Sequence, residues 1–130
     1  MTAQSITHVM TKDYPTLAPD MPIRRAAALL AETGSSAAPV LAEDGHLIGI
    51  LSQKDCFRPA LNASYYREWN GSVGDYMSRE VVAVDVNEEL VAVAKMFLEL
   101  RHRVFPAVEQ DRVVGLVRRS SVLKLLLSLG

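Results

Sequence analysis

The sequence predicts a mixed α/β (α+β) protein built from two tandem β-α-β-β-α units. Three observations support this fold class. The apolar pattern repeats at an interval of 67 residues, each copy contains an amphipathic helical stripe, and two dense apolar strands follow each stripe. The 130 residues suffice for two small units, and 49% hydrophobic with 22% charged residues is an ordinary globular composition.

The two copies align over nearly their whole length. A shift of 67 residues places Met10 on Met77 and Pro39 on Pro106, and after one deletion a shift of 66 places Gly49 on Gly115. Neither copy alone would bury all its apolar surface, so we expect the two to pack face to face. The expected boundaries are a first repeat at 1–62, a connector at 63–75 and a second repeat at 76–130.

Each copy opens with a short extended stretch, at 14–17 and 81–84, and continues into a helix. Apolar residues spaced i, i+3, i+4, i+7 begin at Ile23 and Leu90, which predicts one buried stripe on each helix. Asp20 and Asn87 precede these stripes, and we expect them to cap the helices. The helices are followed by two short strands and a closing helix, and the predicted ranges are 39–41, 47–51 and 53–61 in the first copy and 106–108, 113–117 and 120–129 in the second.

Three aromatic residues, Tyr65, Tyr66 and Trp69, lie where the first copy gives way to the connector. They have the chemistry to stack on bases, but we expect them to pin the connector onto the body of the protein. The last helix is unusually apolar, with Lys124 and Ser128 as its only polar residues after Ser121. Such a helix must be covered by its own module or by a partner chain.

Charge and composition exclude several classes of protein. The net charge of −1 argues against nonspecific binding to nucleic acid, although residues 101–130 hold a local excess of positive charge. That excess is either a solvated face or an anion site. No apolar run approaches the roughly 18 residues that a membrane span needs. Cys56 is the only cysteine, so an intrachain disulfide is impossible and a cytoplasmic location is expected.

The segment with the clearest binding chemistry is Gly49-Ile-Leu-Ser52-Gln-Lys-Asp55. Gly49 lacks a side chain and would let a ligand or another backbone approach closely. Ser52 lies where a strand gives way to a helix, where free N–H groups favour phosphate. Asp55 would offer a carboxylate to both hydroxyls of a ribose. Ser-x-x-Asp is also close to a capping box, which needs no ligand, and both interpretations stay open.

These features together resemble the CBS domain pair, over about residues 9–62 and 76–129. The resemblance rests on the Gly49–Asp55 segment, on the lead-ins Val9-Met10-Thr11 and Tyr76-Met77-Ser78, and on Ala37-Ala38-Pro39-Val40 and Val104-Phe105-Pro106-Ala107. It implies a pseudo-twofold module with two clefts, an adenosine-containing regulatory ligand and frequent pairing of modules into dimers.

The resemblance also implies which residues line each cleft. In the first cleft the ribose would contact Ser52 and Asp55, Ser36 would flank the phosphates, and Arg103 is the expected phosphate contact from the second copy. The base pocket would be lined by Val81, Val82, Val104, Phe105 and Pro106, although plain core is the simpler role for each of these taken singly. The second cleft would be lined by Tyr14, Pro15, Thr16, Ala37, Ala38, Pro39, Arg118 and Ser121.

The second copy departs from the pattern of the first. Arg118 stands in place of Ser52 and Ser121 in place of Asp55, so the second cleft lacks a charged two-point acceptor for a ribose. Its occupancy is therefore doubtful. Arg118 and Arg119 have the chemistry to bind phosphates, because guanidinium groups suit phosphate oxygens. The alternative is that they are surface arginines at the start of a helix.

No catalytic constellation stands out. The sequence has no Walker loop, no Gly-x-Gly-x-x-Gly, no His-Glu-x-x-His and no Cys-x-x-Cys. His46 and His102 are expected at the surface rather than on a metal, and Cys56 is expected to be a buried small side chain whose pKa its acidic neighbour raises. We therefore expect no enzyme, no metal and no catalytic cofactor.

The leading hypothesis is a stand-alone regulatory module that senses an adenosine-containing nucleotide: AMP, ADP, ATP, NAD or S-adenosylmethionine. The alternative is a protein-interaction or dimerisation module with vestigial ligand sites. In both cases we expect a homodimer with the last helix and the helix at 53–61 near the interface, and an effector protein that the sequence does not name. Nucleic acid and membrane are not expected partners.

Overall fold

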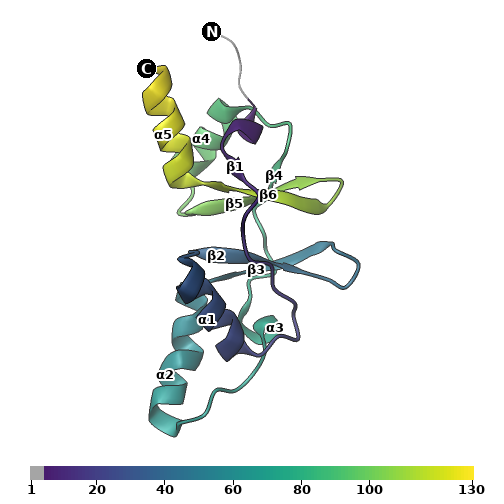
Figure 1. The fold of residues 1–130 in the computed structure, drawn as a ribbon, viewed down its shortest axis with the longest axis vertical. Coiled ribbons are helices and arrows are strands. Elements are labelled where there is room, and N and C mark those ends of the chain that lie inside the picture. The colour runs from purple at the N-terminus through teal and green to yellow at the C-terminus, as the bar shows by residue number, and fades with distance from the viewer. Residues whose placement is uncertain (1–4) are drawn as a thin grey trace. The chain divides into compact units, whose positions relative to one another are not determined.

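The computed structural model describes residues 5–130, so residues 1–4, where the predicted first repeat begins, lie outside the described chain. The chain forms two compact units, each a mixture of helices and strands (Figure 1). Unit 1 comprises the described residues up to Asp13 together with Val82–Gly130, and unit 2 comprises Tyr14–Val81. The predicted mixed fold class is confirmed. The lead-ins of the two repeats, Val9-Met10-Thr11 and Tyr76-Met77-Ser78, each belong to the unit formed by the rest of the other repeat.

Unit 1 is a four-stranded sheet with two long helices. The strands have the order β1-β6-β5-β4, and their bounds are Met10–Thr11, Arg112–Arg118, Val104–Glu109 and Val84–Asp85. β4 pairs with β5 in parallel and the other neighbours are antiparallel. The helices are η1 (Ile6–His8), α4 (Leu90–Glu99) and α5 (Arg119–Leu129).

Unit 2 repeats this arrangement with shorter outer strands. Its hairpin consists of β2 (Ala37–Leu41) and β3 (Leu47–Ser52), and its helices are α1 (Ile23–Thr33), η2 (Lys54–Cys56), α2 (Phe57–Tyr66) and α3 (Val73–Tyr76). Single bridges replace the outer strands: Leu17 pairs in parallel with Val40, and Ser78 pairs antiparallel with Ile50. The register of each hairpin shifts at the same point, after Val40 and after Ala107.

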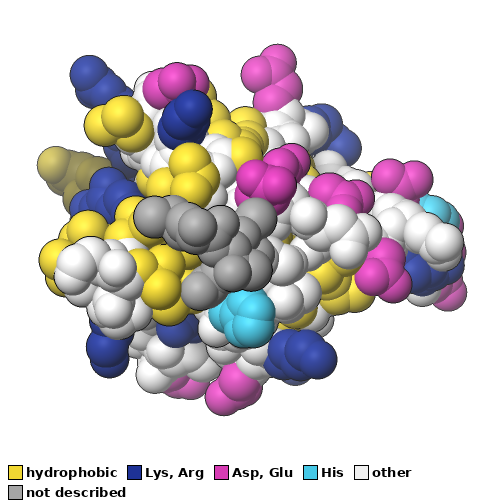
Figure 2. Space-filling model, turned by 90° about the horizontal axis from the view of Figure 1, so that it is seen from above, with side chains coloured by type: hydrophobic (Ala, Val, Ile, Leu, Met, Phe, Trp, Pro, Cys, Tyr) yellow, Lys and Arg dark blue, Asp and Glu magenta, His cyan; other side chains and the backbone are white. Residues whose placement is uncertain are grey.

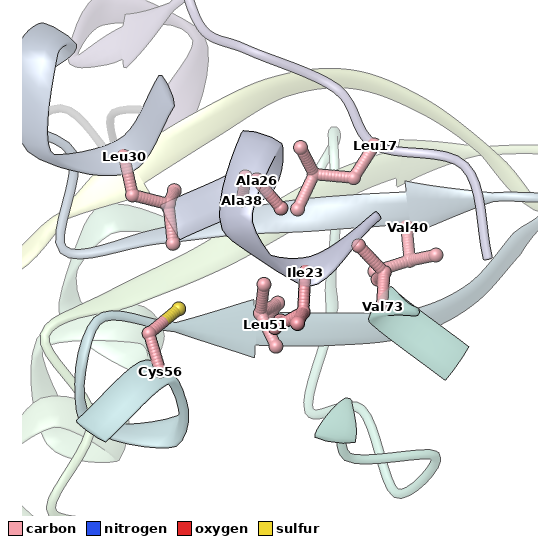
Figure 3. Close-up of a cluster of buried hydrophobic side chains, with 9 residues drawn as sticks. All are labelled: Leu17, Ile23, Ala26, Leu30, Ala38, Val40, Leu51, Cys56 and Val73. Atoms are coloured by element: carbon pink, nitrogen blue, oxygen red, sulfur yellow. The ribbon is translucent and has the colours of Figure 1, made fainter. Parts of the chain in front are cut away.

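The cores of the two units are equivalent position by position. In unit 2 the side chains of α1, α3 and the hairpin converge on one cluster, drawn in Figure 3: Leu17, Ile23, Ala26, Leu30, Ala38, Val40, Leu51, Cys56 and Val73. In unit 1 the residues at the aligned positions form or pack against the second cluster: Val84, Leu90, Val93, Phe97, Phe105, Ala107, Val117, Val122 and Ile6. The apolar pattern of the sequence therefore encodes one packing arrangement used twice.

The glycines in the middle of β3 and β6 have a structural role. A Cβ built on Gly49 would lie 2.6 Å from the Met77 sulfur and 3.0 Å from the Ser78 carbonyl oxygen. A Cβ on Gly115 would overlap Met10 and lie 3.0 Å from the Thr11 carbonyl oxygen. Of the two interpretations of Gly49, the structure therefore supports the close approach of another backbone. The lead-in of one repeat packs on the glycine of the other.

The predicted N-cap residues of α1 and α4 are wrong. The N-cap positions of α1 and α4 are Pro22 and Glu89, neither of which makes a side-chain capping hydrogen bond, and not Asp20 and Asn87. The reason is tertiary: Pro22 forms a bridge with Ser72, and Glu89 forms one with Ser5, so the backbone a few residues before each lead-in pairs with a helix start.

The first closing helix runs further than predicted, and this changes the role of the aromatic residues beside it. After the 3-10 turn η2, helix α2 continues to Tyr66, five residues past the predicted end at 61. Tyr65 and Tyr66 therefore end a helix and are 82% and 73% exposed, so the prediction that they pin the connector is wrong. Trp69 is partly buried and packs against the core of unit 2, as predicted.

Candidate ligand site

Strand β3 of unit 2 ends at Ser52, where the chain turns into η2. The Ser52 N–H donates to Asp55 Oδ2 at 2.9 Å, and the Asp55 N–H donates to Ser52 Oγ at 3.1 Å. This reciprocal pair is a capping box, and it satisfies two backbone donors at a helix start. The capping interpretation of the motif is therefore confirmed.

The capping box leaves hydrogen-bonding capacity at both side chains. Within residues 5–130, Asp55 Oδ1 has no hydrogen-bond partner, and the Ser52 hydroxyl accepts a hydrogen bond without donating one. Both residues are partly exposed. A carboxylate oxygen and a hydroxyl hydrogen thus remain for a ligand, so the capping and ligand interpretations are compatible.

Ser36 lies beside this pair. The Gln53 N–H donates to the Ser36 carbonyl at 2.9 Å, and the strand pairing sets Ala37 opposite Ser52. The Gln53 side chain donates to the Ser35 carbonyl at 2.8 Å, which ties the start of β2 to the end of β3. The structure therefore brings Ser36, Ser52 and Asp55 together at one end of the hairpin, on backbone held by hydrogen bonds.

Cys56 is the buried small side chain that the sequence predicts, at 7% exposure. Its thiol donates to the Ser52 carbonyl at 3.5 Å. Burial raises the pKa of the Cys56 thiol, and the charge of Asp55 raises it further. A thiol with a raised pKa is a poor nucleophile at neutral pH.

The equivalent end of the unit 1 hairpin has the same backbone and different chemistry. The Arg119 N–H donates to the Arg103 carbonyl at 2.8 Å, which matches the bond between Gln53 and Ser36. The pairing of β5 with β6 sets Val104 opposite Arg118. Arg103, Arg118 and Arg119 are all exposed, and α5 begins without a side-chain capping hydrogen bond. Three arginines therefore stand where unit 2 has two serines and a glutamine: Arg103 for Ser36, Arg118 for Ser52 and Arg119 for Gln53.

The apolar residues predicted for the base pocket are largely buried. Phe105 is fully buried in the unit 1 core and stacks on Phe97 with ring centroids 4.3 Å apart, so its simpler role as core is the observed one. Val104 and Pro106 are also buried, whereas Val81 and Val82 are partly exposed.

The residues predicted for the second cleft include three from β2 that are also buried: Ala37, Ala38 and Pro39. Tyr14, Pro15 and Thr16 lead into Leu17, whose N–H donates to the Pro39 carbonyl at 3.0 Å, and partial burial raises the pKa of Tyr14. Ser121 lies in the first turn of α5 and is partly exposed.

The residues of each predicted cleft divide between the two units. For the first cleft, unit 2 supplies Ser36, Ser52, Asp55 and Val81, and unit 1 supplies Val82, Arg103, Val104, Phe105 and Pro106. For the second cleft, unit 2 supplies Tyr14, Pro15, Thr16, Ala37, Ala38 and Pro39, and unit 1 supplies Arg118 and Ser121. The assembly of each full set remains a prediction.

His102 is partly exposed, but one side of its ring faces the unit 1 core. Its ring lies 5.3 Å from that of Phe105, and its Nδ1 atom is buried without a hydrogen-bond partner in residues 5–130. At the equivalent position in unit 2, Ser35 is 5% exposed. His46 is partly exposed, with 45% of its side chain accessible and its Nδ1 atom 2.8 Å from Asp44 Oδ2, so the surface prediction holds for it.

Residues 5–130 contain no group of three or more His, Cys, Asp or Glu side chains placed to hold a metal ion. None of the helices in the same range has the length and apolar character needed to cross a membrane.

The CBS domain family matches the chain twice, at residues 6–61 and 73–128, and the chain therefore belongs to this family. CBS domain-containing protein YhcV of Bacillus subtilis is 31% identical over 114 residues, which cover 87% of this chain and 79% of YhcV. The uncharacterized protein MJ1225 of Methanocaldococcus jannaschii is 24% identical over 123 residues, and here the chain spans only 43% of the relative.

Solved structures of CBS pairs share the fold. The chain is similar to CBSX2 in complex with AMP, with a TM-score of 0.84, 23% identity and coverage of 96% of this chain and 97% of the other. It is also similar to the CBS domain pair of protein MJ0100 in complex with 5′-methylthioadenosine and S-adenosyl-L-methionine. That TM-score is 0.82 at 22% identity, with coverage of 99% and 100%. The predicted tandem CBS fold is confirmed.

Proposed function

We propose that the chain is a regulatory module that binds an adenosine-containing nucleotide, with Ser52 and Asp55 on the ribose. The observation that carries this proposal is the free capacity of the capping box: Asp55 Oδ1 and the Ser52 hydroxyl hydrogen remain unused in the described chain. Family membership supports the ligand class, because CBSX2 was solved with AMP and the MJ0100 pair with S-adenosyl-L-methionine.

Under this proposal the pair contacts a ribose without losing its cap. A ribose presents two neighbouring hydroxyls, each of which can donate to a carboxylate oxygen and accept from a hydroxyl. Asp55 would accept through Oδ1, and Ser52 would donate through its own hydrogen. Ser36 would flank the phosphates from the adjoining segment. Because Gln53 fixes the Ser36 carbonyl and Asp55 fixes the Ser52 N–H, the backbone needs little ordering when the ligand binds.

The arginines of unit 1 are the proposed phosphate contacts. Arg103 would serve the first cleft and Arg118 the second, where Ser121 replaces the carboxylate. Support comes from their exposure and from the uncapped start of α5, since guanidinium groups and free N–H groups both favour phosphate. The first cleft is therefore the proposed adenosine site, and the second is proposed to prefer the anionic part of a ligand.

We further propose that the module acts as a homodimer in the cytoplasm, as a regulator and not as an enzyme. Exposed apolar residues recur at equivalent positions of the closing helices: Phe57 and Leu61 on α2 align with Leu123 and Leu127 on α5. In Figure 2 hydrophobic side chains gather at the left, the side on which α5 lies in Figure 1. These exposed apolar residues of α2 and α5 also support the alternative function of a protein-interaction module with vestigial ligand sites.

The proposed contact between Asp55 and the ribose can be tested with the Asp55→Asn variant. Its affinity for AMP and for adenosine would be measured by isothermal titration calorimetry. Asparagine keeps an oxygen to accept the Ser52 N–H but loses the charge, so the fold should persist. A hydrogen bond to a charged group contributes about 1.5–3 kcal/mol, so the Kd for AMP should rise about ten- to a hundredfold. Ser121→Ala, at the equivalent position in unit 1, is the matched control and should change the Kd much less.

The outcomes separate the two candidate functions. AMP at a hundredfold excess over its Kd should stabilise the fold by about 2.7 kcal/mol in thermal unfolding. An unchanged AMP affinity in Asp55→Asn would show that the ribose binds elsewhere. If none of AMP, ADP, ATP, NAD and S-adenosylmethionine shifts the unfolding temperature at millimolar concentration, the nucleotide proposal fails and the interaction module is favoured.

A further inference from the structure

The loop that joins α2 to α3 (Figure 1) contains the dipeptide Asn70-Gly71, and both residues are exposed. In such a dipeptide the glycine nitrogen can attack the side-chain amide of the asparagine, because glycine has no Cβ to hinder the approach. The attack requires a glycine N–H that is not held in a hydrogen bond. Within residues 5–130 the Gly71 N–H donates no hydrogen bond, and the Asn70 side chain makes none.

The other two asparagines of the chain are each followed by a nitrogen that the fold holds. Asn87 precedes Glu88, whose N–H donates to the carbonyl three residues earlier at 2.9 Å. Asn62 precedes Ala63 inside α2, where N–H groups beyond the first turn are bonded to the helix backbone. Neither of these asparagines is followed by glycine. The sequence and the hydrogen bonding thus both single out Asn70.

The turn between β2 and β3 offers a comparison within the same unit, since Asp44-Gly45 differs from Asn70-Gly71 only in its first residue. The two glycines have similar positive φ angles, 92° and 98°. In the β2–β3 turn, however, the glycine N–H donates to the Ala42 carbonyl at 2.9 Å, and the carboxylate accepts from the backbone N–H two residues on at 3.1 Å. Both groups that would react are therefore held in this turn, whereas both are unbonded at Asn70-Gly71 in the described chain.

The fold requires glycine at position 71, and it uses the carbonyls on either side. With a φ of 98°, a Cβ on Gly71 would lie 2.9 Å from Asp75 Oδ2 and 3.0 Å from the ring of Tyr76. The Gly71 carbonyl accepts from the Ile23 N–H at the start of α1 at 3.1 Å, and the Asn70 carbonyl accepts from the Tyr76 hydroxyl at 3.0 Å. A change in this backbone therefore reaches two helices of unit 2.

We infer that Asn70 is a site of spontaneous deamidation that reacts while unit 2 is folded. The Gly71 nitrogen forms a bond to Cγ of Asn70, the bond from Cγ to Nδ2 breaks, and ammonia leaves with the proton that Gly71 gives up. Water then opens the cyclic imide. Hydrolysis at Cγ yields aspartate, and hydrolysis at the former main-chain carbonyl yields isoaspartate, whose main chain runs through Cβ and is one methylene longer.

The isoaspartyl product alters both attachments of the loop. The added methylene displaces the Gly71 carbonyl from the Ile23 N–H, and the carbonyl that accepts from Tyr76 becomes a free carboxylate. This new negative charge lies in the same loop as the carboxylate of Asp75, which closes the capping box of α3. The loss of one or two hydrogen bonds should lower the folded-to-unfolded ratio by a factor of about 5–30. Unit 2 would thus lose stability as the chain ages.

The variant Asp44→Asn supplies a matched control, because it places the same Asn-Gly sequence in the turn where the glycine N–H is bonded. The folded variant is incubated in mildly alkaline buffer, and its peptides are followed by mass spectrometry. Asn70 should deamidate about tenfold or more faster than position 44, since the Gly45 N–H must first leave its hydrogen bond by local opening. In urea, where the fold is absent, the two rates should converge.

Two further variants separate the chemistry from its consequence. Asn70→Gln, whose longer side chain closes the cyclic imide far more slowly, should abolish the modification at this position. The isoaspartyl form, identified by electron-transfer fragmentation and isolated by ion exchange, should unfold at a lower urea concentration than the starting chain. Asn70→Asp adds the charge without the methylene and should fall between the two.

Equal rates at positions 44 and 70 in the folded variant would overturn the inference, because the unbonded Gly71 nitrogen would then confer no reactivity. Conversion of Asn70 only after the chain is unfolded by urea would overturn it as well. An isoaspartyl form as stable as the starting chain would overturn the expected effect on α1 and α3.

Discussion

The two strand-to-helix junctions, one in each unit, share a backbone and differ in chemistry. The N–H of Gln53 bonds to the Ser36 carbonyl at 2.9 Å, and the N–H of Arg119 bonds to the Arg103 carbonyl at 2.8 Å. In unit 2 a serine and an aspartate close the helix start with reciprocal hydrogen bonds, whereas in unit 1 arginines surround a helix start without a side-chain cap.

This difference separates the residues that form the fold from those that are free for function. The same nine core positions and the same lead-in contacts recur in both units, although one junction carries the Ser52–Asp55 pair and the other carries arginines. The fold therefore depends on the core and on the glycine contacts and tolerates different side chains at the junction. A site with this freedom can be specialised, and the two junctions differ in the side chains they carry.

The largest loss of stability is expected where the two units are alike. Gly49→Ala and Gly115→Ala each place a Cβ against a methionine side chain and 3.0 Å from a backbone carbonyl oxygen, which cannot move away as a flexible side chain can. Each should lower the free energy of unfolding by about 1–3 kcal/mol, measured by urea denaturation. Gly130→Ala, where the nearest atom is 3.6 Å away, is the control. A neutral Gly49→Ala would show that the lead-in contacts are dispensable.

Much of this packing could be predicted from the sequence, because apolar periodicity records which side chains a helix or strand buries. The stripes from Ile23 and Leu90, the hairpins and the family were predicted in this way and are confirmed. The exchange of lead-ins could not be predicted, since periodicity shows that Met10 and Met77 are equivalent but not which sheet each one joins. The capping errors at Asp20 and Asn87 have a related origin, because Ser72 and Ser5, a few residues before those lead-ins, form bridges with the helix starts.

The candidate site was predictable in part. Ser36, Ser52 and Asp55 were identified from spacing and resemblance, and the structure brings them together. The sequence left two interpretations of the Ser-x-x-Asp motif open, a capping box and a ligand site. It could not decide between them, because the residue types do not show whether a carboxylate oxygen stays free of the cap. The buried Nδ1 of His102 was missed because its arginine neighbours suggested a surface position.

A smaller loss of stability is expected from substitutions at the strand-to-helix junctions, where the two units differ. Ser52→Ala removes the acceptor for the Asp55 N–H and should lower the free energy of unfolding by about 1 kcal/mol, the usual contribution of a capping side chain. Arg118→Ala, the equivalent change in unit 1, removes no capping bond and should cost only a few tenths of a kcal/mol. Equal losses in chemical denaturation would mean that the Ser52–Asp55 pair contributes nothing to the fold and exists for the ligand alone.

The smallest effect concerns the residue after each junction, Cys56 in unit 2 and Val122 in unit 1, which occupy equivalent core positions. Burial, and then the charge of Asp55, raises the pKa of the Cys56 thiol, so the folded state holds its proton at a pH where the unfolded chain, with a thiol pKa of about 8.5, releases it. The resulting stability is complete below about pH 8.5 and is lost as the pH rises through the folded-state pKa.

Cys56→Val makes unit 2 resemble unit 1 and should flatten the fall in unfolding free energy between pH 8 and pH 10. Tyr14, whose pKa burial also raises, is present in both proteins, so its contribution cancels in the difference. An identical pH profile for the variant would mean that the thiol is as solvated in the folded chain as in the unfolded one, and that the two cores differ less at this position than their burial indicates.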